Sequence, residues 1–180
     1  NTFRSYEYFR GYNSEENSTY VPTLFEDKDN TLWLGFKNGL SIFNKELNEF
    51  RHFKNQLKAP TKLTQIDDEV RAINSDYLGN LWVGTYNGLY LINQKKEIKH
   101  YVHDENDNNS LSQNSIYDIL EDSKGDMWIG TYAGGINYYD RSFDVFKHFS
   151  SGANNFKLNY KVISSIVETK NDLWVATEGG

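Results

Sequence analysis

Histidine is a common metal ligand and proton carrier, and three of the four histidines in this chain recur at a constant spacing. His52, His100 and His148 lie 48 residues apart. Such regularity suggests a ligand set, but a repeated structural unit produces the same spacing. Residues at one position of a repeat lie in different units, well separated in space. We therefore expect these histidines to bind no metal.

An acidic segment offers a second possible metal site. The run from Asp104 to Asn109 places oxygen-bearing side chains at alternate positions, as at the start of a calcium loop. Asn109 stands where such a loop needs glycine, and Ser115 stands where it needs glutamate. The chain also has no cysteine, which excludes disulfides, thiol catalysis and cysteine-ligated zinc. We expect neither a metal nor a cofactor.

The charge balance bears on possible partners. The net charge is -6 and the isoelectric point is about 5.2. Nucleic acids and anionic membranes attract clustered Lys and Arg, and no basic cluster occurs here. We expect no direct contact of this segment with either. With 38% hydrophobic and 16% aromatic residues, the chain has enough apolar material for a globular core.

The elements that position these residues follow from a tandem repeat. Four tryptophans lie 49, 46 and 46 residues apart, each as the second residue of one of four similar segments: 32–36, 81–85, 127–131 and 173–177. Each repeat contains short apolar runs separated by turn residues, which is typical of strands. A period in the forties with four strands per unit predicts the blades of a β-propeller. The fold class is therefore all-β.

The third repeat shows the expected strands most plainly. They cover Ile116 to Glu121, Met127 to Thr131, Gly135 to Tyr139 and Val145 to Phe149. The second repeat gives Val70 to Asn74, Leu81 to Thr85, Leu89 to Ile92 and Ile98 to Val102; the first gives Val21 to Phe25, Leu32 to Phe36, Leu40 to Phe43 and Phe50 to Phe53. The expected boundaries are the last strand of a preceding blade in 1–19, blades at 20–68, 69–115 and 116–161, and a partial blade at 162–180. The chain is thus an incomplete arc of about four blades.

The repeated turn residues have structural explanations. Asp27, Asp76 or Asp122 stands six residues before a tryptophan, where its carboxylate can accept turn amides. Three residues before the tryptophan stands Asn30, Gly79 or Gly125, which tolerate positive φ. The glycine two residues after the tryptophan leaves room for a neighbouring blade. The fourth turn is one residue shorter, so we expect it to be tighter. The expected structural residues are Trp33, Trp82, Trp128, Trp174, Asp76, Gly79, Asp122 and Gly125.

Propeller geometry brings two sets of loops to one end of the molecule. These are the short turns after each tryptophan strand and the long connections between blades. Aromatic faces suit sugar rings, and Asn, Arg and Glu can bond to hydroxyl groups. The candidate ligand-binding residues at this end are Lys37, Asn38, Arg71, Tyr86, Asn87, Tyr117, Tyr132 and Glu178. The alternative for each of these residues is a solvated loop tip that contacts no ligand.

The segment from Asn109 to Thr131 closely resembles the two-component regulator propeller repeat. It has Ser-Leu-Ser, an apolar strand ending in Glu-Asp, a glycine turn and Trp-Ile-Gly-Thr. The second repeat keeps the strand, the glycine turn and Trp-Val-Gly-Thr, but lacks Ser-Leu-Ser. The first has Phe36 in the threonine position. The resemblance covers essentially the whole chain.

This resemblance implies the periplasmic sensor of a hybrid two-component system, as found in Bacteroidetes. Such receptors carry a membrane helix, a histidine kinase and a DNA-binding domain outside the propellers. The resemblance further implies an oligosaccharide or other small ligand, a homodimer in the full-length protein, transcription regulation, and no catalytic residue in this segment. The alternatives are a protein-docking scaffold or a propeller enzyme, a lyase or glycosidase, for which Glu69 and Glu178 are the available acids.

Overall fold

The computed structural model describes residues 3, 20–53, 66–149 and 158–179. These residues form antiparallel strands joined by turns, in an all-β arrangement. No helix in these ranges is long and apolar enough to cross a membrane.

The strands form four separate sheets in chain order. The first sheet contains β1 (Thr23–Glu26), β2 (Leu32–Phe36), β3 (Gly39–Asn44) and β4 (Glu49–His52). The second contains β5 (Val70–Ser75), β6 (Leu81–Thr85), β7 (Gly88–Ile92) and β8 (Ile98–Tyr101). The third contains β9 (Ile116–Glu121), β10 (Met127–Thr131), β11 (Ile136–Asp140) and β12 (Val145–Phe149), and the fourth pairs β13 (Ile163–Glu168) with β14 (Leu173–Thr177).

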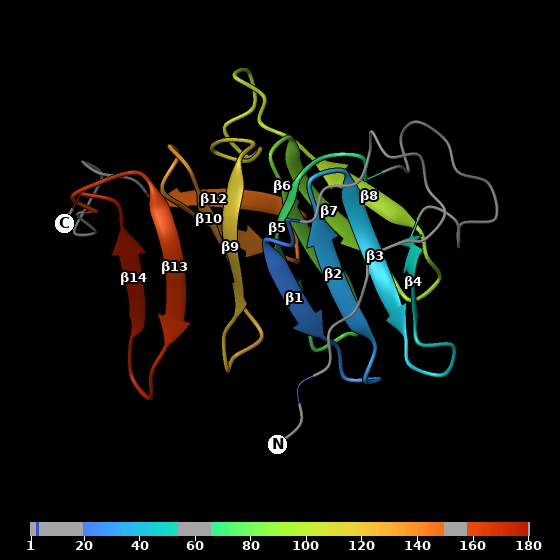
Figure 1. Cartoon of the computed structure of the whole chain (residues 1–180). Helices are drawn as coiled ribbons and strands as arrows, with labels where there is room; N and C mark the ends of the chain where they lie inside the picture. The colour runs from blue at the N-terminus through green and yellow to red at the C-terminus, as the bar shows by residue number, and fades with distance from the viewer. Residues whose placement is uncertain (1–2, 4–19, 54–65, 150–157, 180) are drawn as a thin grey trace.

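The sheets stand side by side as blades of an unclosed propeller, which confirms the predicted fold class (Figure 1). The first strands of successive sheets, β1, β5, β9 and β13, contact one another in sequence order and form the inner edge of the arc. Figure 1 shows the β1–β2, β9–β10 and β13–β14 turns at one end, called the Asp-turn end below. The opposite end, which carries the short turns after β2, β6, β10 and β14, is called the loop end.

Most predicted strands agree with the structure to within a residue or two. In the third sheet, β9, β10 and β12 have the predicted bounds. The strand expected from Val21 begins instead at Thr23. Pro22 explains the difference, because proline has no N–H to donate to a strand partner. The expected strand before residue 20 lies outside the described residues.

Each of the three junctions between neighbouring sheets is closed by a glycine. A Cβ added at Gly35 would lie 2.7 Å from Cγ1 of Val70, and one at Gly84 would lie 2.5 Å from Cγ2 of Ile116. The third such distance, from Gly130 to Cγ2 of Ile163, is 2.6 Å. Real side chains do not approach so closely, so only glycine allows this spacing. The predicted reason for these glycines is confirmed.

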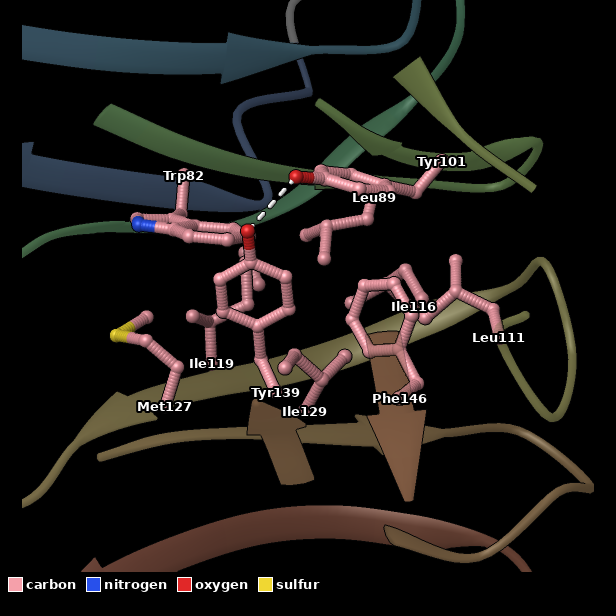
Figure 2. Packing of buried hydrophobic residues seen from close by; sticks show 11 residues of the cluster. Trp82, Leu89, Tyr101, Leu111, Ile116, Ile119, Met127, Ile129, Tyr139 and Phe146 are labelled. Atoms are coloured by element: carbon pink, nitrogen blue, oxygen red, sulfur yellow. Dashed lines mark hydrogen bonds between the residues drawn. The ribbon is translucent and has the colours of Figure 1, made fainter. Parts of the chain in front are cut away.

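The junction of the second and third sheets shows how the core is filled (Figure 2). Trp82 of β6 is fully buried, and the ring of Tyr139 from β11 packs edge-on against it at a centroid distance of 4.9 Å. The hydroxyl groups of Tyr101 and Tyr139 lie 3.0 Å apart. Aromatic pairs of this geometry stabilise beyond the area that they bury.

The aspartate turns have the predicted geometry and one unpredicted bond. Oδ1 of Asp76 accepts hydrogen bonds from the amides of Leu78 and Asn80, at 3.1 and 2.8 Å. Its other oxygen accepts the indole N–H of Trp82 at 2.9 Å. The same three contacts recur at Asp27 with Trp33 and at Asp122 with Trp128. Gly79 and Gly125 have positive φ of 79° and 83°. The constant six-residue spacing of Asp and Trp is the sequence signal for this bond.

The fourth repeat departs from this pattern. Its turn is tighter, as predicted, because the amide of Thr169 donates directly to the carbonyl of Asp172 at 2.8 Å. Trp174 is 67% exposed, whereas Trp33 and Trp82 are 4% and 0% exposed and Trp128 is half-buried. Within the described ranges no further sheet covers this face of β14, so the packing role expected for Trp174 is not fulfilled here. In the strand register Thr169 takes the aspartate position, and Glu168 matches Glu121: it accepts the amide of Ser123 as Glu121 accepts the amide of Tyr77.

Candidate functional site

A bulge at the start of the inner strand sets the geometry of the loop end. In β5, β9 and β13 the pairing register shifts by one residue, leaving Arg71, Tyr117 and Ser164 unpaired in the ladder. A bulge re-aims the side chain that it carries, and such irregularities are common beside binding sites. Arg71 and Tyr117 therefore occupy matching positions in neighbouring sheets.

These bulges bring four of the predicted ligand residues into one stack. The guanidinium of Arg71 lies 5.1 Å from the ring centroid of Tyr86 and 4.8 Å from that of Tyr117. The rings of Tyr117 and Tyr132 are 5.6 Å apart and nearly parallel, at 29°. We call Tyr86, Arg71, Tyr117 and Tyr132 the tyrosine–arginine ladder. Tyr86 and Tyr132 are 57% and 46% exposed, so the ladder presents aromatic surface to solvent.

Hydrogen bonds from Arg71 and from the two short turns hold the ladder in place. Arg71 donates from Nε to Glu69 at 3.2 Å and from an η nitrogen to the hydroxyl of Ser115 at 3.3 Å. The amide of Tyr86 donates to the carbonyl of Glu69, and the amide of Tyr132 donates to the carbonyl of Ser115. Each short turn is thus tied to the residue that precedes the inner strand of its own sheet.

The other four predicted ligand residues lie on the short turns of the loop end, and three of them belong to the first and fourth sheets. Lys37 and Asn38 lie on the turn after β2, and Glu178 lies on the turn after β14. Asn87 donates to a carboxylate oxygen of Asp68 at 2.6 Å. Ser164 and Glu178 occupy the positions that Tyr117 and Tyr132 hold in the third sheet, so the described aromatic platform spans the second and third sheets.

Acidic residues precede Arg71 of the ladder in the sequence. Asp67 and Asp68 directly precede Glu69 and the first residue of β5. Burial raises the pKa of Tyr90 to about 12, and the charges of Asp68 and Asp67 contribute to the rise. Tyr90 is therefore a neutral donor under physiological conditions, and its side chain hydrogen-bonds to Asp68.

Two grooves lie at the Asp-turn end instead, between the first and second sheets. Their volumes are about 550 and 590 Å³, and they share Asp27, Asp29, Trp33 and Lys96. The matching space between the second and third sheets is filled by Tyr139 and Arg141. The second sheet carries Ile92 and Gln94 at those positions. The grooves therefore follow from smaller packing residues, and we take the ladder as the better site because its side chains converge.

The histidines and the acidic segment have structural partners. The ring of His100 stacks on Tyr90 with a centroid distance of 4.0 Å, and the ring of His148 bonds to the carbonyl of Ser110. The side chain of His52 lies outside the described residues. In the segment after β8, the amides of Asn106 and Asn109 bond to the side chains of Asp104 and Asp107. In the described ranges, no three His, Asp or Glu side chains are placed to hold a metal.

Comparisons with known proteins identify the repeats. The family model of the two component regulator propeller matches residues 15–38, 64–87 and 110–133. The sequence has no match among curated proteins. Among solved structures, the chain is similar to the extracellular domain of a protein described as a hybrid two component system of B. thetaiotaomicron, with 26% identity and a TM-score of 0.69 over 94% of this chain.

Two further structures share the fold at lower identity. The extracellular domain of another such B. thetaiotaomicron protein has 21% identity and a TM-score of 0.68 over 87% of this chain. Virginiamycin B lyase from Staphylococcus aureus has 21% identity and a TM-score of 0.59 over 86% of it. The chain spans about a fifth of the length of the two B. thetaiotaomicron extracellular domains, at 21% and 20%, and 47% of the lyase.

Proposed function

This chain is built from two-component regulator propeller repeats, and on that premise we propose that it is part of the sensory propeller of a hybrid two-component receptor. In this proposal it binds an oligosaccharide at the loop end and has no catalytic role of its own. The similarity to two extracellular domains of proteins described as hybrid two component systems supports this assignment. It also supports a periplasmic location for the segment, as part of an inner-membrane receptor.

The observation that carries the proposal is the tyrosine–arginine ladder. Sugar rings present apolar C–H faces that stack on aromatic rings, and their hydroxyls bond to planar polar groups. The exposed rings of Tyr86 and Tyr132 offer the first kind of contact, and the guanidinium of Arg71 offers the second. Because the ladder joins two sheets, a ligand bound across it would contact both at once. Ligand binding could thereby influence how neighbouring blades pack.

An enzymatic role has less support from the described residues. The likeness to the lyase is at 21% identity and concerns the fold alone. A glycosidase would require a pair of carboxyl groups at the site, one as acid and one as base or nucleophile. Glu69, one of the two acids available, is bonded to Arg71 at 3.2 Å. The proposal therefore assigns signalling, including any kinase activity, transcription regulation and homodimerisation, to the full-length receptor.

Calorimetry of the complete ectodomain against an oligosaccharide panel tests the proposal. We expect the double variant Tyr86→Ala with Tyr132→Ala to lose at least about tenfold in affinity, since it removes the apolar surface of two exposed rings and a loss of about 1.4 kcal/mol already corresponds to a factor of ten. Asp122→Asn at the Asp-turn end is the control, and its affinity should stay near that of the wild type. Unchanged affinity in a correctly folded double variant would reject the ladder as the site.

A further inference from the structure

The ion pair between Arg71 and Glu69 bears on which saccharides the ladder can accept. An arginine at a sugar site usually suggests recognition of a carboxylate or sulfate, because its guanidinium pairs with such groups through two parallel hydrogen bonds. Here that edge is already engaged: Nε bonds to Oε1 of Glu69 at 3.2 Å. The side chains of Arg71 and Glu69 are only 22% and 28% exposed, which limits screening of the pair by water.

The remaining contacts of Arg71 also leave little capacity for an anion. One η nitrogen donates to Ser115, and the guanidinium carbon lies over the rings of two tyrosines, Tyr86 and Tyr117. Among the described residues, the other η nitrogen is the donor with no recorded partner. It can donate a hydrogen bond to a neutral hydroxyl group. It cannot supply an uncompensated positive charge while Glu69 is ionised.

The surrounding charges act in the same direction. Asp67 and Asp68 add two negative charges next to Glu69 in the sequence, and Asp68 accepts a hydrogen bond from Asn87, which follows Tyr86 of the ladder. Like-charge repulsion and the desolvation of an unpaired anion would both oppose a uronate or sulfated sugar.

We propose that Glu69 is a specificity-determining residue that restricts the ladder to uncharged saccharides, with Arg71 acting as a stacking and hydroxyl-binding group. This inference rests on the proposed function, since it concerns the same site. Glu69 is a positioning residue for Arg71 in this scheme. Its removal should convert Arg71 into an anion-binding group without removing any aromatic surface.

The test compares oligogalacturonates with their methyl esters, which keep the same sugar backbone and lose the negative charge. Calorimetry of the wild-type ectodomain should show tighter binding of the neutral member. Glu69→Gln should shift the acidic-to-neutral affinity ratio by about tenfold or more towards the acidic member, because hydrogen bonds to charged groups are strong. Asp68→Asn is the control: it removes the same charge from the neighbouring residue, which makes no described bond to Arg71.

The outcomes separate the two proposals. A shift in Glu69→Gln that clearly exceeds the shift in Asp68→Asn supports the inference. Equal shifts in the two variants, or a wild type that prefers the acidic member, would overturn it while leaving saccharide sensing intact. Absence of binding to every saccharide would overturn the proposed function, and the inference with it.

Discussion

At the scale of single residues, Asp76 connects its own turn with groups that lie far from it in the sequence. Its carboxylate is fully buried and accepts bonds from its own turn, from Trp82 and from Arg141 of the third sheet, the last at 2.8 Å. Arg141 also lies over the ring of Trp82. One carboxylate thus fixes a turn, the orientation of a core tryptophan and the approach of the next sheet.

The ionisation of Asp76 should make stability depend on pH. Burial raises the pKa of this carboxyl, but bonds from Trp82, Arg141 and Asn80 outweigh burial and hold the pKa below its ordinary value of 3.8. A depressed pKa in the folded state means that the stabilisation is complete above the unfolded pKa of about 3.9 and is lost as pH falls through the folded value. Acid should therefore weaken the propeller below about pH 4.

The variant Asp76→Asn tests this prediction. At pH 7 it should lower the free energy of unfolding by about 1 to 3 kcal/mol, because it leaves the Arg141 charge and the indole N–H without their acceptor. Its melting temperature should also fall less steeply with acid than that of the wild type. Asp29→Asn, at an exposed position of the first aspartate turn, is the control. The same acid dependence in Asp76→Asn and wild type would contradict this role.

Residue spacing predicted part of this network. The six-residue interval between Asp76 and Trp82 identified the turn, because turn chemistry is local. The bond from Arg141 spans 65 residues and was not predicted. It depends on how two sheets are placed, and nothing in the spacing of Arg141 within its own repeat indicates that its guanidinium reaches back to the preceding blade.

At the scale of elements, the packing of one strand against the next sheet depends on the missing side chain of a glycine. Gly84 of β6 faces Ile116, the first residue of β9. The fourth repeat has Ala176 at this position, so β14 cannot receive a branched side chain equally closely. Within the described residues, no further sheet packs against Ala176.

Gly84→Ala should separate the second and third sheets. Its Cβ would lie 2.5 Å from Cγ2 and 2.9 Å from Cβ of Ile116, so one strand must shift. Overpacking of this kind typically costs about 1 to 3 kcal/mol, measurable by urea unfolding of the purified propeller. Adding Ile116→Ala should recover part of the loss, giving a double variant less destabilised than the sum of the singles. An unchanged midpoint in Gly84→Ala would show that the sheets are not in close contact.

Strand positions were largely predictable, whereas the bulges were not. Alternation and turn residues located β9, β10 and β12, since both signals act over a few residues. The sequence near Arg71 and Tyr117 carries no distinct signal for a shifted register. The sequence therefore predicted that the eight ligand candidates lie at the loop end. It did not predict which four of them would stack, because that depends on the bulges.

At the scale of the whole molecule, the first and fourth sheets each expose apolar side chains at positions that other sheets bury. Leu24 on the first sheet is 62% exposed, although the matching Ile119 and Ile166 are each 4% exposed. On the fourth sheet, Trp174 and its strand partner Val167 are 67% and 55% exposed. In the sheets that have a neighbour on that side, the matching positions are buried or half-buried.

The Asp-turn end and the loop end of the propeller differ in chemistry. Aspartate turns and their bonds to tryptophan occupy one end and serve stability. The tyrosine–arginine ladder occupies the loop end. Its described hydrogen bonds to Glu69 and Ser115 hold Arg71 in place. This division is the central claim of our account, because it separates the residues that hold the propeller together from those that we propose bind the ligand.

Hydrogen–deuterium exchange of the complete ectodomain, with and without a saturating oligosaccharide found by calorimetry, tests this division most directly. We predict slower exchange in the ladder segments 69–72, 84–87, 115–118 and 131–134. We predict no change in the aspartate turns at 27–31, 76–80 and 122–126, which lie at the opposite end. Protection of the aspartate turns, with unchanged exchange in the ladder segments, would contradict the account.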